Sequence, residues 1–419
     1  MVLNASTKFG IASSYPPDQF ERDMRFGAGA GMEIILKITE RCNIACTYCY
    51  FFFAGDESYK SHPAYIHDDV VDGLARFLSE GRRSYDLRRV RLILHGGEPL
   101  LLKKSRMTQL LVKIGEACSG MEFQVTLQTN AMLVDEEWIE IFKQHRVTVG
   151  VSLDGPKWIH DKYRVDKRGR GTYDRVLQGV RLLQNAHSDG RLQAAPGLLA
   201  VINPEFTADE IYHHCIKTLS FKNVDFLLPD LDHNTRTKSE IDKITKFVSE
   251  LLTLYRQELD AGVKVRIVDS ALRELRVLPI HASLLQRFLS QKEIVFVVAS
   301  SGEIQPEDVL RTTDPDLMNT GLNVITSTLK DLLLSPALAR LNDLSYSVPA
   351  DCMSCNWVNV CRGGILYHRY SSDNGFNNCS VHCESLKTLY SGACETLMLA
   401  GGDFNQLNSR LAKKPSAII

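Results

Sequence analysis

The chain has 419 residues, of which 44% are hydrophobic, so it can bury a large core and is expected to form more than one domain. A formal net charge of -1 argues against general nucleic-acid affinity, because binding to phosphates needs an excess of positive charge. No apolar run is long enough to cross a bilayer, and Met1–Met32 lacks the pattern of a signal peptide. We therefore expect a cytoplasmic protein with no nucleic-acid partner and no membrane partner.

From Glu33 to about Pro229, short β-branched runs alternate with longer amphipathic stretches. The apolar spacing predicts strands at 33–38, 90–94, 123–127, 148–153, 198–202 and 224–228. Helical patterns lie between them at 68–80, 105–117, 135–144, 172–185 and 207–219. Six βα units in series imply a parallel sheet with helices outside it, which curls into a partial (β/α)6 barrel. Such barrels carry their sites on the loops at the carboxyl ends of the strands.

A helical pattern at 238–257 leads out of the barrel, and a β run at 294–299 follows a more irregular region. The C-terminal part is richer in Cys, Asn and Gly. We expect five segments: an N-terminal extension (1–32), the barrel (33–235), a helical bridging region (236–293), a cysteine-rich domain (294–395) and a tail (396–419).

Cys42, Cys46 and Cys49 follow the first predicted strand with the spacing C-x3-C-x2-C. In a cytoplasmic chain, eleven cysteines are better explained as metal ligands than as disulfides. Packing thiols or structural zinc are the alternatives, but zinc usually takes four ligands and the next cysteine is Cys118. Three thiolates suit a [4Fe-4S] cluster whose fourth iron can bind a small molecule and pass it an electron.

This loop resembles the cluster loop of the radical S-adenosylmethionine (SAM) enzymes, in which the amino and carboxylate groups of SAM chelate the open iron. Further motifs follow in the family's order: HGGEP at 95–99, LQTN at 127–130, SLDGP at 152–156 and an arginine at 164. Each motif alone is weak evidence for a SAM site. Gly-Gly turns, helix caps, loop arginines and apolar strands also occur in proteins for purely structural reasons. Together the motifs imply a SAM site on the following residues: Tyr48, Gly96, Gly97, Glu98, Thr129, Asn130, Ser152, Arg164 and Phe226.

A second group of cysteines has the spacing C-x2-C-x5-C at Cys352, Cys355 and Cys361, and Cys383 follows further along. Four thiolates complete a cluster with no open iron, although they could also close a zinc site. The spacing resembles the SPASM domain, the auxiliary-cluster extension of peptide-modifying radical SAM enzymes. The resemblance implies one auxiliary [4Fe-4S] cluster on these four cysteines, with Cys379 as an alternative to Cys383.

The resemblance to the SPASM domain is incomplete. A full domain holds a second auxiliary cluster, with ligands in the segment that here reads 297–307 and at the position of Ile365, and this chain lacks those cysteines. The space left by that cluster could accept an extended peptide. The other three cysteines, Cys118, Cys215 and Cys394, are interpreted as packing or surface thiols.

Asp308 aligns with an acid that serves as proton acceptor in the sulfatase-maturing relatives. Radical oxidation of a C–H bond must lose a proton as well as an electron, so a carboxylate near the substrate is needed. An ordinary surface acid is the alternative. Further candidates for the same role lie at the end of the sixth strand: Asp230, Asp232 and His233.

The resemblance covers the chain from Glu33 to about Tyr390 and favours the sulfatase-maturing and peptide-modifying branch. Two segments, FLLPD at 226–230 and NNCSVHCESL at 377–386, are similar to those of enzymes that join a side-chain β-carbon to an aromatic ring in three-residue cyclophanes. We predict an enzyme that cleaves SAM to a 5′-deoxyadenosyl radical and crosslinks a ribosomally made precursor peptide, with an electron donor such as flavodoxin or ferredoxin. A formylglycine-forming sulfatase maturase, a thioether-forming maturase and a non-catalytic iron–sulfur or zinc module are the alternatives.

Overall fold

A nine-stranded sheet in the order β11-β10-β1-β3-β4-β5-β7-β8-β9 forms the centre of the computed structural model, which describes residues 30–258, 261–276 and 294–412. All neighbouring strands run parallel except the β10–β11 pair. The strands are β1 Ala30–Thr39, β3 Leu87–Gly96, β4 Glu122–Thr129, β5 Thr148–Ser152, β7 Gly197–Val201, β8 Asn223–Leu227, β9 Lys264–Val265, β10 Ile294–Val298 and β11 Ile304–Gln305.

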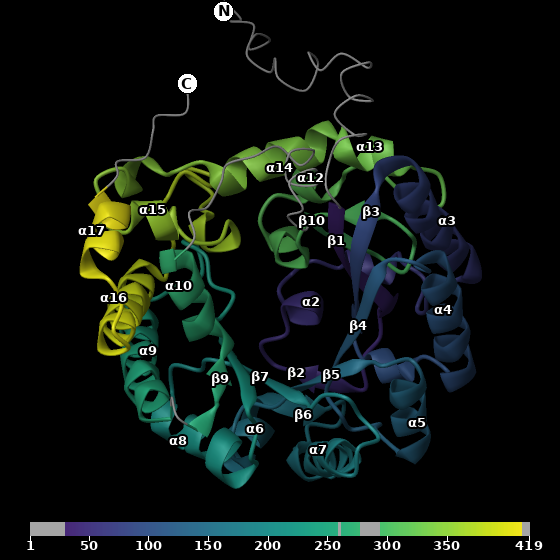
Figure 1. The fold of residues 1–419 in the computed structure, drawn as a ribbon, viewed down its shortest axis with the longest axis horizontal. Helices are drawn as coiled ribbons and strands as arrows, with labels where there is room; N and C mark the ends of the chain where they lie inside the picture. Colours follow the sequence, from purple (N-terminus) through teal and green to yellow (C-terminus); the bar gives the residue numbers. More distant parts are fainter. Residues whose placement is uncertain (1–29, 259–260, 277–293, 413–419) are drawn as a thin grey trace, which may run out of the picture.

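Helices cover the outside of this curved sheet, so that strands and helices together form an open ring (Figure 1). This arrangement confirms the expected partial barrel with a parallel sheet and outer helices. The helices of this part are α3 Asp68–Tyr85, α4 Lys104–Ala117, α5 Glu136–Gln144, α6 Lys157–Tyr163, α7 Tyr173–Ser188, α8 Ala208–Tyr212 with a π-helical turn His213–Thr218, and α9 Lys238–Gln257.

Strand β1 shows why the barrel forms. Alternate residues of a strand point to opposite faces, and Met32, Ile34 and Leu36 are fully buried on one face. Their neighbours in β3 and β10 are equally apolar, with Ile34 opposite Leu92 and Phe296. Lys37 breaks this apolar run, yet it is only 1% exposed, so β1 carries one buried charge near the end where the predicted site lies.

The loops at the carboxyl ends of the strands contain short elements that surround the site. The strand β2 (Ile44–Cys46) pairs antiparallel with β6 (Arg164–Asp166). The short helix α2 (Tyr50–Phe53) lies over the middle of the ring in Figure 1. Two single 3-10 turns complete this region, at Ser58–Lys60 and Pro99–Leu101.

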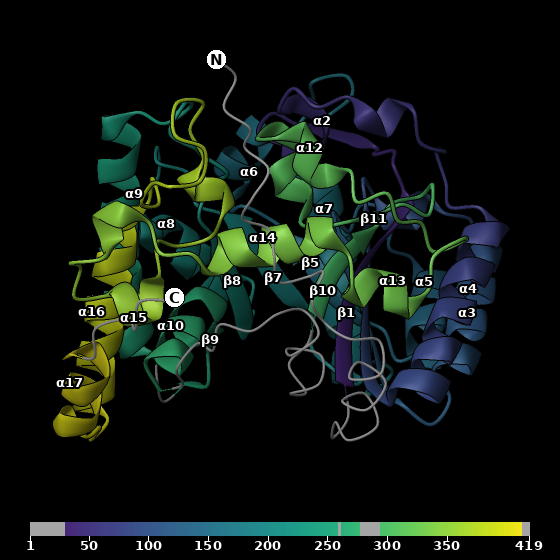
Figure 2. The ribbon, with the colours of Figure 1, turned by 90° about the horizontal axis from the view of Figure 1, so that it is seen from above.

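The last part of the chain, from residue 383 to residue 412, packs against the end of the barrel at which α9 lies (Figure 2). Helix α16 (Cys383–Leu399) contacts both α9 and α10 (Arg266–Arg276). The remaining elements are the 3-10 turn Asp308–Thr312, α12 Pro315–Met318, α13 Leu329–Leu333, α14 Pro336–Tyr346, the 3-10 turn Ala350–Cys352, α15 Val358–Cys361, the 3-10 turn Tyr367–Arg369 and α17 Phe404–Ala412.

The sheet is wider than the six strands expected from the sequence. Ile294–Val298, assigned above to the cysteine-rich domain, pairs with β1, and Lys264–Val265 of the predicted bridging region pairs with β8. Most of the predicted N-terminal extension (1–29), the end of the bridging region (277–293) and the end of the tail (413–419) lie outside the described residues. Within the described residues, no helix has the length and apolarity needed to span a membrane.

Candidate active site

The cluster loop, residues 42–49, follows β1 at the carboxyl end of the barrel strands. Its strand β2 pairs with β6, which places Cys46 opposite Arg164. A hydrogen bond of 3.1 Å from the amide of Cys49 to the carbonyl of Cys46 tightens the second half of the loop, and α2 begins directly afterwards at Tyr50. The three thiols are thus held between the first barrel strand and a short β-ribbon.

Gly96 and Gly97 lie against the backbone that leads into the cluster loop. The amide of Gly97 donates to the carbonyl of Thr39 at 2.9 Å, and the amide of Glu98 donates to the carbonyl of Arg41 at 2.8 Å. A Cβ at Gly96, where φ is +135°, would lie 2.0 Å from the Thr39 carbonyl oxygen. No other residue can approach so closely, so both glycines fix the position of the cluster loop as well as facing the cavity described below.

The carboxylate of Glu98 is hydrogen-bonded to other residues of the protein. It accepts hydrogen bonds from the Thr129 hydroxyl at 2.7 Å, the Asn130 amide at 2.8 Å and the Leu100 amide at 3.0 Å. Burial raises the pKa of Glu98 to about 6, although these hydrogen bonds oppose the shift. Glu98 therefore joins the second and third barrel loops, and its side chain does not line the cavity.

Arg164 and Asp154 form a buried ion pair next to the cluster loop, and the more exposed Tyr48 reaches the same carboxylate. Arg164 donates to the two carboxylate oxygens of Asp154, from Nε at 2.8 Å and from Nη2 at 3.2 Å, while the Tyr48 hydroxyl also donates to Asp154. The remaining guanidinium nitrogen, Nη1, lies 3.8 Å from Cys46 Sγ. Burial would raise the pKa of Asp154, but the Arg164 charge outweighs it and the pKa is lowered. The sequence pointed to Arg164 and Tyr48 but missed Asp154, which lies in the SLDGP motif.

One large cavity, of about 1200 Å³, occupies the barrel mouth. Phe226 is only 1% exposed and packs edge-on against Phe247, with ring centroids 5.9 Å apart, yet it also reaches the cavity wall. Ser152, which accepts a 2.8 Å hydrogen bond from Gln128, also lines the cavity. The predicted site residues brought together on this wall are Cys42, Cys46, Tyr48, Cys49, Gly96, Gly97, Thr129, Asn130, Ser152, Arg164 and Phe226.

The chemistry of the three N-terminal thiols fits an iron–sulfur cluster. Burial raises the pKa of Cys42 to about 12, and burial also raises the pKa values of Cys46 and Cys49. Such thiols become ligands only when a metal supplies positive charge, because the thiolate is the ligating form. Among the described residues, no group of three or more His, Cys, Asp or Glu side chains has the arrangement of a site for one metal ion. Cys42, Cys46 and Cys49 could hold a cluster that spans several irons.

The C-terminal cysteines also gather around one small cavity. Five thiols line it, so the structure brings together the four predicted ligands and the alternative Cys379. The thiols of Cys379 and Cys383 are hydrogen-bonded to each other, and Cys383 is the first residue of α16. The five cysteines are Cys352, Cys355, Cys361, Cys379 and Cys383. Cys118 and Cys215 are buried in the apolar core and Cys394 packs against it, as expected for packing thiols.

Glu307, at the end of the segment 297–307, and Ile365 both line the large cavity. They stand where a full SPASM domain has ligands of the second auxiliary cluster that this chain is predicted to lack. Ile365 is 56% exposed. The cavity therefore extends from the cluster loop to the C-terminal part of the chain, over the place where a second cluster would need ligands.

Asp308 lies beside this cavity but is turned away from it. Its neighbours Glu307 and Val309 line the cavity, whereas the carboxylate of Asp308 is 6% exposed and forms an ion pair with Lys37 of β1. Tyr50 donates to the same carboxylate at 3.2 Å, and Arg311 lies 3.5 Å away. Burial would raise the pKa of Asp308, but Lys37 and Arg311 lower it.

Lys37 and Tyr50, which sequence reasoning missed, connect Asp308 to the rest of the site. Lys37 Nζ also lies 2.9 Å from His95 Nδ1, and burial followed by the Lys37 charge lowers the pKa of His95 to about 3. His95 is therefore neutral and accepts from Lys37. The only signal for Lys37 in the sequence is a basic residue within the apolar run from Ile34 to Ile38.

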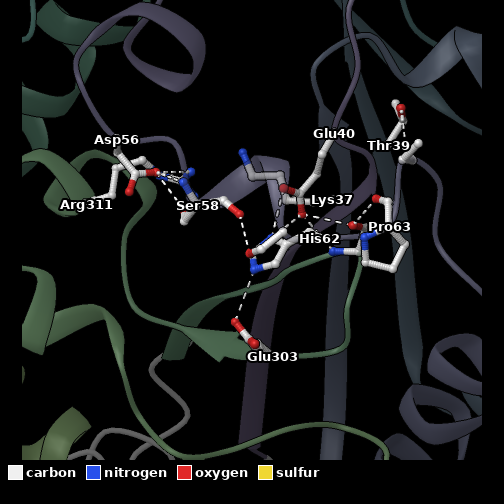
Figure 3. Close-up of polar contacts among 12 residues, drawn as sticks. Lys37, Thr39, Glu40, Asp56, Ser58, His62, Pro63, Glu303 and Arg311 are labelled. Carbon is white, nitrogen blue, oxygen red and sulfur yellow. Dashed lines mark hydrogen bonds and ion pairs between the residues drawn. The ribbon is translucent and has the colours of Figure 1, made fainter.

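His62 links the segment after the cluster loop to the β10–β11 hairpin (Figure 3). Its Nδ1 lies 2.9 Å from the buried Glu40 carboxylate, and its Nε2 lies 3.3 Å from Glu303. Glu40 also accepts from the backbone and the hydroxyl of Ser300, at 3.1 and 3.0 Å. Hydrogen bonding to Glu40 raises the pKa of His62, although burial opposes it.

The three other acid–base candidates lie in different surroundings. Asp232 is buried, and its carboxylate accepts from the amides of Asn234 and Thr235 at 2.9 and 2.8 Å, which closes a turn. His233 Nε2 lies 2.8 Å from the carbonyl of Cys379. Asp230 lines the large cavity.

The fold and the cysteine-lined cavity have the features of a radical SAM enzyme. Residues 36–211 match the model of the Radical SAM superfamily, a range that begins in β1 and ends in α8 and contains the cluster loop. The enzymes of this class use SAM and [4Fe-4S] clusters, and the match supports the cofactors predicted from the sequence.

Characterised relatives cover most of the chain. A cysteine-type anaerobic sulfatase-maturating enzyme of Clostridium novyi is 24% identical over 369 residues, which cover 85% of this chain and 93% of the relative. The enzyme of the same description from Clostridium perfringens is 25% identical, with 87% and 96% covered. A serine-type anaerobic sulfatase-maturating enzyme of Bacteroides thetaiotaomicron is 34% identical over 143 residues, or 34% of each chain.

Solved structures support the same fold. Native anSMEcpe with bound AdoMet and Kp18Cys peptide superposes with a TM-score of 0.73 at 23% identity, covering 88% of this chain and 99% of that one. SuiB of Streptococcus suis bound to its precursor peptide SuiA gives 0.55 at 17% identity, covering 86% and 77%. The predicted architecture, a partial radical SAM barrel followed by a SPASM-like C-terminal domain, is confirmed.

Proposed function

We propose that this protein is a peptide maturase that joins a side-chain β-carbon to an aromatic ring in a ribosomally made precursor peptide, giving a cyclophane. The observation that supports it is the single cavity of about 1200 Å³ with the cluster loop on one wall and Glu307 and Ile365 on another. Small-molecule pockets usually hold about 300–1,000 Å³, so this space suits SAM together with a segment of peptide.

In this proposal Cys42, Cys46 and Cys49 hold the SAM-binding cluster, which on reduction supplies the electron that splits SAM into methionine and a 5′-deoxyadenosyl radical. The cavity residues Gly96, Gly97, Thr129, Asn130, Ser152 and Arg164 position SAM, with Tyr48 and Phe226 near its adenine. Glu98 acts from behind this wall, because its hydrogen bonds to Thr129 and Asn130 hold the third loop in place. The protein's own task is to orient the target carbon and to exclude water.

The C-terminal cysteines Cys352, Cys355, Cys361 and Cys383 hold the auxiliary cluster in this scheme. A cluster with four thiolate ligands has no open iron, so its suitable role is to accept the second electron of the oxidation. Forming the new carbon–carbon bond also releases a proton from the ring. Asp308 was the sequence candidate for accepting it, and its carboxylate is connected to the cavity through Tyr50, which lines the cavity and donates to it.

Formylglycine formation is the second candidate function. It is favoured by the relatives of Clostridium novyi and Clostridium perfringens, which are sulfatase-maturating enzymes and align over 85% and 87% of this chain. Formylglycine formation oxidises one Cys or Ser side chain, whereas a cyclophane links two residues. A thioether-forming maturase would need a cysteine in the precursor.

Mass spectrometry after anaerobic co-expression tests these functions. The enzyme is paired with a candidate precursor, a short peptide that contains aromatic residues, and, separately, with a sulfatase-derived peptide. We expect the first peptide to lose two hydrogens for each crosslink and to resist fragmentation between the joined residues. An aldehyde trapped by hydroxylamine in the sulfatase peptide, with no change in the first peptide, would instead assign formylglycine formation. A variant with serine at 42, 46 and 49 should abolish SAM cleavage, while Cys394→Ser is the matched control.

A further inference from the structure

A peptide carbon radical that adds to an aromatic ring leaves the attacked ring carbon with one hydrogen too many. Restoring the ring releases that hydrogen as a proton and one electron. The proton needs a base that faces the cavity, carries no competing partner and is ionised at the working pH. Four carboxylates line the cavity: Asp225, Asp230, Glu274 and Glu307.

Three of these carboxylates are already engaged. Asp225 accepts from Arg266 Nε at 2.7 Å, and Glu274 accepts from the Tyr390 hydroxyl at 2.5 Å. Glu307 also has a polar partner. The carboxylate of Asp230 forms no hydrogen bond or ion pair with any residue that the structure describes. The hydrogen bond found at this residue is accepted by its backbone carbonyl.

The backbone at Asp230 is nevertheless held firmly. Asp230 follows β8, the sixth barrel strand, at the end where barrel sites lie. The carbonyl of Pro229 lies 3.0 Å from His382 Nε2, and the Tyr367 hydroxyl donates to the carbonyl of Asp230 at 3.3 Å. His382 directly precedes Cys383, so one hydrogen bond connects this turn to the cysteines that we assign to the auxiliary cluster.

Asp308 is less suited to the same step. Its carboxylate is paired with Lys37, contacts Arg311 and does not line the cavity. Tyr50 donates to Asp308 and lines the same cavity as Asp230. Burial raises the pKa of Asp230 to about 6, whereas Lys37 and Arg311 lower that of Asp308. A carboxylate with a pKa near neutrality binds a proton more readily than one that two cations hold ionised.

We infer that Asp230, held at the end of β8 by Pro229–His382 and Tyr367, is the proton acceptor of the crosslinking reaction. The inference rests on the proposed function. In the balanced step, the ring carbon gives its proton to the Asp230 carboxylate and its electron to the oxidised auxiliary [4Fe-4S] cluster. Asp308 instead pairs with Lys37 and accepts from Tyr50.

The pH dependence of the step follows from the groups that face Asp230. Tyr50 and Tyr367 have raised pKa values because they are buried, so neither ionises near neutrality. Burial lowers the pKa of His382 to about 4 and that of His368 well below its ordinary value. Crosslinking should therefore fall as the pH drops through about 6, when Asp230 becomes protonated.

The test measures the ratio of crosslinked peptide to 5′-deoxyadenosine for the reconstituted full chain, with the candidate precursor peptide that the wild-type enzyme crosslinks. Asp230→Asn should lower this ratio about 100-fold, the usual contribution of a general base, and should remove the inflection near pH 6. Asp242→Asn, at an exposed position of α9, is the control and should keep the wild-type ratio.

Asp230→Glu retains a carboxylate and should restore at least about a tenth of the wild-type ratio, which separates proton transfer from loss of folding. A wild-type ratio and pH profile in Asp230→Asn would overturn the assignment, and so would an equal loss in Asp230→Glu. If the wild-type enzyme cleaves SAM but forms no crosslink, both the proposed function and this inference are wrong. A crosslinking wild type with an unaffected Asp230→Asn variant overturns the inference alone.

Discussion

Gly97 lies so close to Arg41 that a Cβ on the glycine would be 2.2 Å from the Arg41 carbonyl oxygen. That carbonyl belongs to the residue before Cys42 and accepts from the amide of Glu98 at 2.8 Å. The second barrel loop therefore sets the position of the first cluster ligand through backbone contacts alone.

Gly97→Ala should displace the cluster loop and lower the iron content of the anaerobically purified protein. The clash involves two backbones, neither of which can rotate away, so we expect a destabilisation of about 1–3 kcal/mol in urea unfolding. Gly115→Ala on α4 is the matched control, because its nearest neighbour is a Phe123 ring atom 3.9 Å away. An iron content at the wild-type level in Gly97→Ala would contradict the role assigned to this contact.

Arg164→Met should destabilise the protein by about 3–5 kcal/mol, because it leaves the buried Asp154 carboxylate without its cation. Both side chains are below 10% exposure, at 8% and 5%. The control is Arg170→Met, which removes a surface partner of Asp166 with the arginine 68% exposed and should leave the free energy of unfolding unchanged. Equal effects of the two substitutions would show that the buried ion pair contributes no more to the free energy of unfolding than the exposed one.

The repeated βα units were predictable because each strand and helix has a local apolar period, and the helix predicted at 238–257 has the same bounds in the structure. The pairing of β10 with β1 was not predictable from the sequence. It joins Ile34 to Phe296, which strands β3 to β9 separate along the chain, so it depends on packing rather than on local sequence. Motifs indicated which residues gather at the mouth. They could not show that the carboxylate of Glu98 is used by Thr129 and Asn130, or that Asp308 is paired with Lys37.

His62 should stabilise the fold most at low pH. Its pKa is raised above the ordinary value of 6.5, first by the hydrogen bond to Glu40, with the charges of Glu40 and Glu303 adding to it and Arg311 opposing it. A raised histidine pKa means that the folded state holds the proton more tightly, so this stabilisation is complete below 6.5 and is lost as the pH rises through the folded value.

The difference in unfolding free energy between the wild type and His62→Gln, measured from acidic to alkaline pH, should therefore shrink as the pH rises. His145→Gln offers a control of opposite sign, because burial lowers the pKa of His145 and its cost to the folded state appears at low pH. A difference for His62→Gln that stays constant with pH would rule out the bridge between Glu40 and Glu303.

Lys37 and Asp308 should behave as one unit in a double-mutant cycle. Lys37→Met and Asp308→Asn each leave a buried charge without its partner and should cost about 3–5 kcal/mol alone. The double variant should cost clearly less than the sum, because neither charge remains. Urea unfolding of the four proteins measures the coupling, and additive effects would mean that the ion pair contributes nothing.

Cys383→Ser should remove one cluster, lowering the iron content from about eight to about four atoms per chain, whereas Cys379→Ser should keep both clusters. The reason lies in where each thiol is fixed. Cys383 begins the 17-residue helix α16, which fixes its backbone position beside the other cysteines. Cys379 precedes the helix, and its carbonyl is bound by His233. Iron analysis and the electronic spectrum of the reduced variants decide between the two, and a four-iron Cys379→Ser protein beside an eight-iron Cys383→Ser protein would reverse the assignment.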